Sequence, residues 1–440
     1  MNSSPMPPVE RTVGPAGTTA RPGDAAVWWV LAHVALLPFP GLAEAVLSAG
    51  ALFAVVRLLQ LRARGGIAPL LTTEAWGLTC LLFLAYWLPQ VLAAADALDP
   101  GKALGKAGTA LRYLPFMWLV AIAVATARRR RRVFAGIGVL ALVWAGDALL
   151  QAGLGHSPLL QVLDAASQGL GGGALCPAHE VQAAGRYNGI FSECNPKLGQ
   201  VLAVLAPFVL LLAGRRHVVW AALAVLCLAA VLFSGARAAW LSYGLVLLAS
   251  GMQRYGRRGV LVLALAGVLG LGLSALLVPA VGQRVQASAG LLSGQGELAD
   301  AALAGRGRIW AGALCMVGEH PVNGVGVRGF RHAWEDCDPT PAQPAAWGEG
   351  PALHAHQLVL EILAETGVLG LLLWLAGVAL AIRAWRYAPA TARQRAWPAA
   401  LAVGVALFPL NTHLAVYSTF WGGICLLLAA LYVGALQARE

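Results

Sequence analysis

The stretch LAVYSTFWGGICLLLAALYVGAL, residues 414–436, contains 23 residues and no charged side chain. An α-helix needs about 20 apolar residues to cross the hydrocarbon core of a bilayer. Similar apolar blocks recur along all 440 residues, of which 59% are hydrophobic and 12% charged, with a mean hydropathy of +0.70. Soluble domains average about 25% charged residues. The sequence therefore predicts a protein that crosses a membrane many times.

The form of the apolar blocks indicates helical spans. Lipid offers no partner to an unpaired backbone amide, so spans are helices or closed barrels, and continuous apolar runs exclude the alternating barrel pattern. We predict an all-α fold, a polytopic transmembrane helical bundle of about twelve spans. The predicted spans are 26–39, 41–60, 74–94, 111–127, 133–153, 198–213, 217–234, 237–252, 259–280, 357–384, 397–411 and 414–436.

Basic residues set the predicted orientation, because short loops rich in Lys and Arg stay in the cytoplasm. Twenty of the 31 basic residues lie in alternate loops or at the termini: Arg11, Arg21, Arg57, Arg62, Arg64, Arg128, Arg129, Arg130, Arg131, Arg132, Arg215, Arg216, Arg254, Arg257, Arg258, Arg383, Arg386, Arg393, Arg395 and Arg439. We expect both termini in the cytoplasm of a multi-pass inner-membrane protein. The net charge of +11 is then mainly a topology signal, and nucleic acid is not an expected partner.

This orientation divides the chain into four parts. Residues 1–24 are rich in Pro, Gly, Ser and Thr without the apolar core of a signal peptide, and we expect a disordered cytoplasmic tail. Residues 25–280 carry helices one to nine and the external loop 154–197. Residues 281–356 form a large periplasmic loop, and residues 357–440 hold the last three helices and a short cytoplasmic tail.

The remaining 11 basic residues oppose the charge trend that sets the topology. They are Lys102, Lys106, Arg112, Arg186, Lys197, Arg237, Arg284, Arg306, Arg308, Arg328 and Arg331, all in or beside predicted external segments. Arginine pairs bidentately with phosphate oxygens, so an anionic partner such as a diphosphate is the favoured explanation. The alternative is pairing with nearby acids: Glu297, Asp300, Glu335, Asp336 and Asp338.

Four cysteines fall in the two long external loops. Cys176 and Cys194 share the first loop, while Cys315 and Cys337 share the second, and an oxidising periplasm would allow a disulfide within each. Four cysteines allow three pairings, so this connectivity is a hypothesis. Their spacing matches no zinc pattern, and we expect no metal site. Three more lie inside predicted spans as apolar packing residues: Cys80, Cys227 and Cys425.

The large loop contains two local patterns. Residues 308–320 are typical of a short helix on the membrane surface, ended by Pro321. Residues 324–329 satisfy the dinucleotide fingerprint G-x-G-x-x-G, but the required βαβ unit is missing. Tight turns, or close approach of backbone to a ligand, are the remaining explanations for these glycines.

Titratable residues cluster where the large loop meets the tenth predicted span. His354 and His356 precede Glu361 and Glu365. A histidine at the membrane surface suits a general base, since its pKa lies near working pH, although a structural histidine is the alternative. A metal site at the two histidines would need a third ligand, and none is evident in the sequence beside them. Intramembrane carboxylates are costly and mark functional sites, as substrate-site groups or as the proton relay of a transporter.

Four segments with these residues resemble, in order, motifs of the O-antigen ligase and polymerase superfamily. Residues 186–195 are similar to its R-x-x-G-x-F block with a nearby asparagine, and residues 234–240 to its S-R-x-x-W segment, with two extra residues after the serine. Residues 306–330 resemble its R-x-x-x-W and P-x-x-G-x-G run. Residues 356–367 resemble its H-x-x-x-L-x-x-x-x-E-x-G segment.

The resemblance implies a class C type glycosyltransferase that works without a metal or other cofactor. Arg186 and Arg306 would hold the diphosphate of an undecaprenyl-linked glycan donor, with Arg237 a weaker candidate, while His356 would activate the acceptor hydroxyl. Arg308 competes with Arg306 for the anion, and His354 with His356 as the base. The rest of the expected substrate-binding set is Asn188, Asn195, Arg328 and Glu361.

Within the superfamily, the favoured function is an O-antigen ligase that transfers the donor glycan to lipid A-core during lipopolysaccharide maturation. The compact chain without a large soluble extension favours it. An O-antigen polymerase and a protein O-oligosaccharyltransferase are the alternatives. A proton-coupled secondary transporter is a remote one, because we find no internal repeat and the polar residues lie outside the spans. The expected partners are the donor, the lipid A-core acceptor and membrane lipids.

Overall fold

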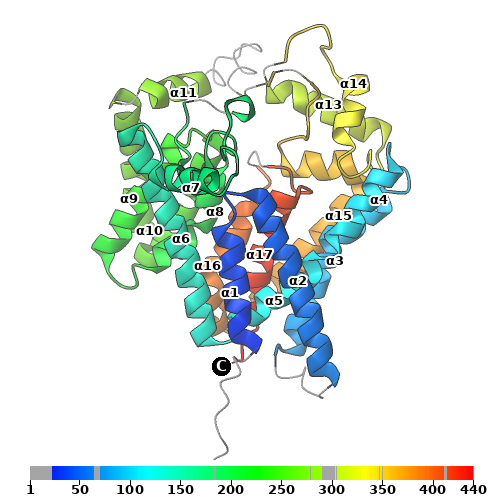
Figure 1. Cartoon of the computed structure of the whole chain (residues 1–440), viewed down its shortest axis with the longest axis horizontal. Coiled ribbons are helices and arrows are strands. Elements are labelled where there is room, and N and C mark those ends of the chain that lie inside the picture. Colours follow the sequence, from blue (N-terminus) through cyan, green and yellow to red (C-terminus); the bar gives the residue numbers. More distant parts are fainter. Residues whose placement is uncertain are drawn as a thin grey trace, which may run out of the picture.

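The computed structural model describes residues 22–63, 70–181, 185–277, 279–289, 303, 305–345, 347–348, 350–410 and 414–439. These residues are largely helical and include no strand, which confirms the predicted all-α fold. Helices α7, α11, α13 and α14 gather at one end of the bundle, and the C terminus lies at the opposite end (Figure 1). We call the first of these the loop end.

The helices are α1 (Pro22–Ala35), α2 (Pro40–Ala63), α3 (Thr73–Ala93), α4 (Pro100–Ala110), α5 (Tyr113–Val124), α6 (Ala127–Leu154), α7 (Pro158–Gly169), α8 (Leu198–Leu211), α9 (His217–Phe233), α10 (Arg237–Leu277), α11 (Pro279–Ala289), α13 (Arg306–Glu319), α14 (Phe330–Cys337), α15 (Leu358–Tyr387), α16 (Ala390–Ala406) and α17 (Thr419–Leu436). Two short 3-10 helices are η1 (Ala178–Glu180) and η2 (Gly189–Phe191). Each predicted span falls on one of these helices. Two spans share α10, which Gly256 interrupts with φ 67°.

Within the described ranges, six helices are long and apolar enough to cross a membrane: Pro40–Ala63, Thr73–Ala93, Pro100–Val124, Ala127–Leu154, Leu358–Tyr387 and Thr419–Leu436. Shorter apolar helices cover Leu198–Leu211, His217–Phe233 and Gly267–Leu276. The chain is therefore a multi-pass membrane protein. The count of about twelve spans stays a prediction.

Central and peripheral helices differ in which faces they bury. Nearly every side chain of α8 and α17 is buried, which is typical of helices at the middle of a bundle. On α2, Leu52 and Leu59 remain 66% and 61% exposed, on a surface suited to lipid.

Small residues let the backbones of neighbouring helices approach closely. A Cβ at Gly434 of α17 would lie 2.6 Å from the carbonyl oxygen of Ala121 in α5.

Helix α15 is broken near its start, although we predicted one span there. Gly367 has φ 65°, and it separates residues 358–366 from residues 368–387. The break is filled by residues 321–329, which we call the glycine loop. Val325 N donates to Ala364 O at 2.8 Å, and Val368 N donates to Pro321 O at 2.9 Å. Contacts distant in sequence thus satisfy the backbone groups freed by the break.

Close backbone packing explains the two glycines that open the fingerprint-like segment. Gly324 has φ +69°, and a Cβ there would lie 2.5 Å from the backbone of Glu365 and Thr366. Gly326 has φ +89°, and a Cβ there would lie 2.3 Å from Cβ of Ala97. Of the two explanations left by the sequence, the tight turn describes the structure, because both glycines have positive φ and Gly329 N donates to Gly326 O at 2.9 Å. The glycine loop is consequently held between α15 and the end of α3.

The large loop has its own small hydrophobic core, and each of the two external loops contains a disulfide. Helices α13 and α14 pack through Ile309, Met316, Phe330 and Trp334, and α13 coincides with the predicted short helix. Disulfides join Cys176 to Cys194 and Cys315 to Cys337, the two pairs expected from the sequence. Glu319 lies beside the second pair, but the disulfide removes both sulfurs as metal ligands.

Candidate functional site

Four arginines from four segments converge at the loop end. Arg186 precedes η2, Arg237 begins α10, Arg284 belongs to α11 and Arg306 begins α13. Burial lowers the pKa of Arg306, and the positive charges of Arg237 and Arg186 lower it further. Burial and the same two charges lower the pKa of Arg284. We call these four residues the arginine cluster.

The corner between α9 and α10 positions two of the four. Tyr187 N donates to Phe233 O at 3.3 Å, and the two rings stack edge-on at 5.9 Å, so Arg186 is held beside the corner. Ser234 Oγ and Trp240 Nε1 both donate to Val231 O, at 2.7 and 3.2 Å. The serine and tryptophan of the motif thereby close the corner that places Arg237 in the first turn of α10.

Arg284 joins the cluster through a glycine that departs from the family motif. Gly235 has φ +70°, and a Cβ there would lie 2.7 Å from the guanidinium carbon of Arg284. The two extra residues of the Ser234–Trp240 segment therefore include the one that makes room for this guanidinium. Arg284 is one of the predicted external basic residues, and the motifs predict no role for it. Its position just after an apolar run was the available signal.

The histidine pair is attached to the helix that begins with Arg306. Trp310 Nε1 donates to the carbonyl oxygen of Ala355 at 3.1 Å, and Ala355 is fully buried between His354 and His356. The two imidazole rings lie 3.7 Å apart. Arg306 and Trp310 are one turn apart and share a face of α13. The histidine pair therefore lies close to the part of α13 that contributes to the arginine cluster.

His356 has an unusual backbone conformation. Its φ is 55°, in the left-handed region that residues other than glycine rarely adopt. Such conformations cost roughly 1–3 kcal/mol and gather at functional sites, where surrounding structure imposes them. Arg328 shares this feature, with φ 67°.

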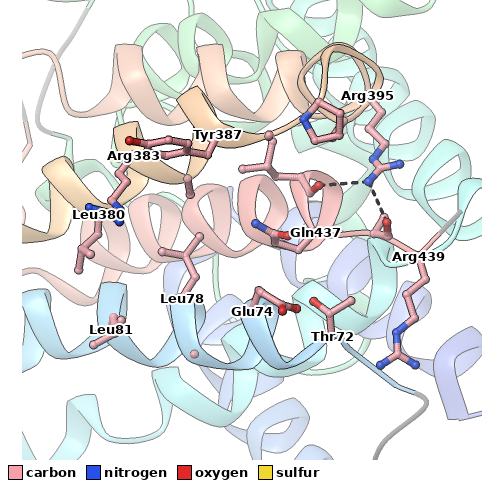
Figure 2. A pocket seen from close by; sticks show the side chains of 17 residues that line it. Thr72, Glu74, Leu78, Leu81, Leu380, Arg383, Tyr387, Arg395, Gln437 and Arg439 are labelled. Carbon is pink, nitrogen blue, oxygen red and sulfur yellow. Dashed lines mark hydrogen bonds between the residues drawn. The ribbon is translucent and has the colours of Figure 1, made fainter.

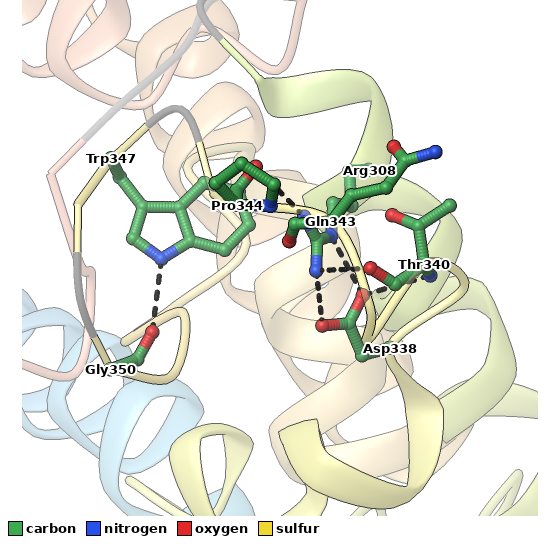
Figure 3. A network of polar contacts seen from close by, with 7 residues as sticks. All are labelled: Arg308, Asp338, Thr340, Gln343, Pro344, Trp347 and Gly350. Carbon is green, nitrogen blue, oxygen red and sulfur yellow. Dashed lines mark hydrogen bonds and ion pairs between the residues drawn. The ribbon is translucent and has the colours of Figure 1, made fainter.

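Arg308, two residues from Arg306, has a different role. Its Nε and Nη2 donate to the two carboxylate oxygens of Asp338 at 2.7 and 2.6 Å (Figure 3). The guanidinium also donates to Thr340 O at 2.7 Å and lies 5.5 Å from the centroid of the Trp347 ring. The hydrogen bonds from Arg308 hold the pKa of Asp338 below its usual value. Arg308 therefore pairs with a nearby acid, which was the alternative to binding an external anion. We call this ion pair the Arg308–Asp338 clamp.

The two predicted asparagines have different surroundings. Asn195 Nδ2 donates to Pro38 O at 3.0 Å, which ties its loop to the connection between α1 and α2. Asn188 is fully buried, and its Oδ1 and Nδ2 have no hydrogen-bond partner in the part of the chain that the structure describes. It follows Arg186 by two residues. The Oδ1 atom of Asn195 is also buried without a partner among the described residues, so both asparagines remain candidates for contact with a ligand.

Arg328 and Glu361 lie in a second group of charged residues, beside the glycine loop. Tyr417 N donates to Glu361 Oε1 at 3.4 Å, so this carboxylate faces the start of α17. Arg328 and Arg331 lie near Glu365, and both glutamates are 1% exposed. The charges that shift the pKa of Arg331 are those of Arg328 and Glu365. The predicted roles of Arg328 and Glu361 in substrate binding therefore stay predictions.

A cavity of about 750 Å³ lies at the end of α3 that contains Thr72 and Glu74 (Figure 2). Its wall includes Glu74, Arg383 and Arg395. Arg395 donates to the carbonyls of Ala435 and Leu436 at 2.9 and 3.1 Å, where α17 ends. This guanidinium therefore satisfies the orphan carbonyls of a helix terminus.

The fold and the loop end together define a helical, multi-pass membrane protein with a cationic site beside a histidine pair. Residues 222–375 match the family model Wzy_C, described as O-antigen ligase. This segment is similar to the O-antigen ligase family, and the match supports the resemblance that the motifs predicted. The matched segment contains Arg237, Arg284, Arg306 and His356. A search of curated proteins gives no match.

Proposed function

We propose that this protein is an O-antigen ligase that transfers an undecaprenyl-diphosphate-linked polysaccharide to lipid A-core on the periplasmic face of the inner membrane. The observation that carries the proposal is the convergence of Arg186, Arg237, Arg284 and Arg306 beside the His354–His356 pair. The family match supports a membrane glycosyltransferase-like enzyme. The particular donor, acceptor and residue roles are our proposal.

The arginine cluster would bind the diphosphate of the donor. The charges of Arg186 and Arg237 lower the pKa of Arg284 and Arg306, and a diphosphate bound among these guanidinium groups would offset that repulsion. Negative charge on the leaving diphosphate grows as the glycosidic bond breaks. Fixed cationic donors stabilise such developing charge more in the transition state than in the ground state. The cluster would therefore lower the barrier as well as bind the donor.

His356 would act as the general base, and His354 would orient it. The acceptor hydroxyl oxygen attacks the anomeric carbon, His356 takes the hydroxyl proton, and the bond from that carbon to the diphosphate oxygen breaks. Undecaprenyl diphosphate leaves with the bonding electrons. General-base catalysis by a positioned histidine contributes about 10²–10⁴-fold. The positive charge required comes from arginines, so the proposed mechanism uses no metal or other cofactor.

Charge distribution and disulfides support the proposed orientation. The runs Arg128–Arg132 and Arg383–Arg395 lie at helix ends away from the loop end, as expected of cytoplasmic loops. Both disulfides lie at the loop end, as expected of an oxidising compartment. We therefore place the loop end in the periplasm and both termini in the cytoplasm.

The test is transfer in vitro by the purified protein in detergent with EDTA, a polyprenyl-diphosphate glycan and lipid A-core. We expect glycosylated lipid A-core from the wild type and from Arg131→Gln, an exposed arginine at the start of α6. Arg306→Gln and His356→Ala should each lose at least about 100-fold. Extension of the donor, or glycosylation of an added protein, would replace the ligase proposal by one of its sibling activities. Equal activity in all variants would contradict the site.

A further inference from the structure

A second basic pocket lies at the loop end, between α4 and the glycine loop. Its volume is about 530 Å³. Five basic side chains and one carboxylate line it: Lys102, Lys106, Arg328, Arg331, His332 and Asp99. Asp99 is occupied as the N-cap of α4 and pairs with Lys102 at 2.8 Å. The pocket therefore keeps a net positive charge.

The walls of this pocket are fixed by backbone contacts. Leu98 N donates to Val325 O at 3.2 Å, and Gly326 packs directly against Ala97, so the α3–α4 connection is fastened to the glycine loop. Arg331 Nε and Nη2 are buried without a hydrogen-bond partner among the described residues. Burial, together with the charge of Arg328, lowers the pKa of Arg331, while Glu365 acts in the opposite direction. A rigid pocket thus contains guanidinium nitrogens suited to an anionic oxygen.

The outer face of α4 has the character of a helix at a membrane interface. Ala103 and Ala107 face the protein, while Lys102 and Lys106 are exposed. Leu104 and Leu111 are 55% and 48% exposed beside them. Exposed lysines among exposed leucines are typical of segments at the level of lipid headgroups, where the charges meet phosphate and the aliphatic groups meet acyl chains.

We propose that this pocket binds the phosphorylated headgroup of an anionic lipid, with acyl chains of the lipid lying along Leu104 of α4 and along Leu111, which follows the helix. The site is separate from the arginine cluster and requires no glycan transfer. Where the proposed ligase function also holds, the lipid in this pocket is the phosphorylated acceptor. That last step rests on the proposed function, whereas binding of the headgroup does not.

The chain offers a site-specific probe, because its three lysines are Lys102, Lys106 and Lys197. Lys102 and Lys106 line the pocket, whereas Lys197 lies over the Phe420 ring at 4.6 Å. The experiment measures acetylation of each lysine by mass spectrometry, in the full chain in neutral detergent. The probes are phosphatidic acid, diacylglycerol with the same acyl chains, and inorganic phosphate.

We expect phosphatidic acid to slow acetylation of Lys102 and Lys106 at least fivefold, with diacylglycerol giving no protection and Lys197 unchanged. Arg331→Gln should abolish the protection, and Arg306→Gln in the arginine cluster should retain it. If Arg331→Gln does not fold, Arg328→Gln serves as the second variant. Equal protection by diacylglycerol, or by inorganic phosphate at the same concentration, would overturn the lipid headgroup. Loss of protection in Arg306→Gln would overturn the separate site, whatever the transfer assay shows.

Discussion

Arg306 and Arg308 lie two residues apart on α13, yet one belongs to a cluster of like charges and the other to an ion pair. Arg308 meets both carboxylate oxygens of Asp338 and is 12% exposed. Arg306 instead lies among Arg186 and Arg237, whose charges lower its pKa. Arginine in an ion pair stabilises the fold, whereas arginine held among other arginines is suited to an external anion. The partner, and not the residue type, decides the role.

The largest expected difference is in catalysis. Arg306→Gln should lower kcat for glycan transfer about 100- to 1000-fold, as loss of one charge-stabilising donor does in other sites. Its melting temperature should stay unchanged or rise, because the substitution relieves repulsion within the arginine cluster. Transfer assays and differential scanning fluorimetry in detergent would measure both. A fall in melting temperature with normal kcat would reverse the roles assigned to Arg306 and Arg308.

The clamp should show the opposite pattern, with an effect on stability. Asp338→Asn removes the charge but keeps the size of the side chain, and should reduce the free energy of unfolding by about 2 kcal/mol. Thermal melting would detect the change, and Asp336→Asn, at a neighbouring acid without an assigned ion pair, is the matched control. A melting temperature equal to that of the wild type would show that the clamp contributes nothing.

The arginine cluster also predicts a smaller effect at Gly235. Gly235→Ala places a methyl group against the Arg284 guanidinium and strains a positive φ, so the guanidinium must shift. Because three arginines remain in place, transfer should fall by about tenfold, or roughly 1.4 kcal/mol in the barrier. Gly105→Ala, at a glycine of α4 with open space around it, is the control. Unchanged transfer in Gly235→Ala would exclude Arg284 from the cluster.

Local patterns in the sequence were sufficient for the helices and for the two cysteine pairs. Contacts between residues that are distant in the sequence could not be predicted from such patterns. The break in α15 at Gly367 depends on carbonyls of Pro321 and Val322, so the apolar run alone indicated one continuous span. Arg308 could not be told from Arg306, because its partner Asp338 is 30 residues further along. Arg284 likewise depends on space made by Gly235, which no spacing rule reveals.

The smallest expected effect is the pH dependence of the clamp. The hydrogen bonds from Arg308 hold the pKa of Asp338 below its ordinary value of 3.8, so the folded state binds this proton less readily than the unfolded state does. The ion pair therefore contributes its full stability above the unfolded pKa and loses it as pH falls through the folded pKa. We expect the melting-temperature difference between wild type and Asp338→Asn to be constant above about pH 5 and to shrink below about pH 4. Because Asp338→Asn lacks the titrating group, its own melting curve controls for every other carboxylate. A difference that grew on acidification would mean that Asp338 is protonated more readily in the folded protein, and would contradict the clamp.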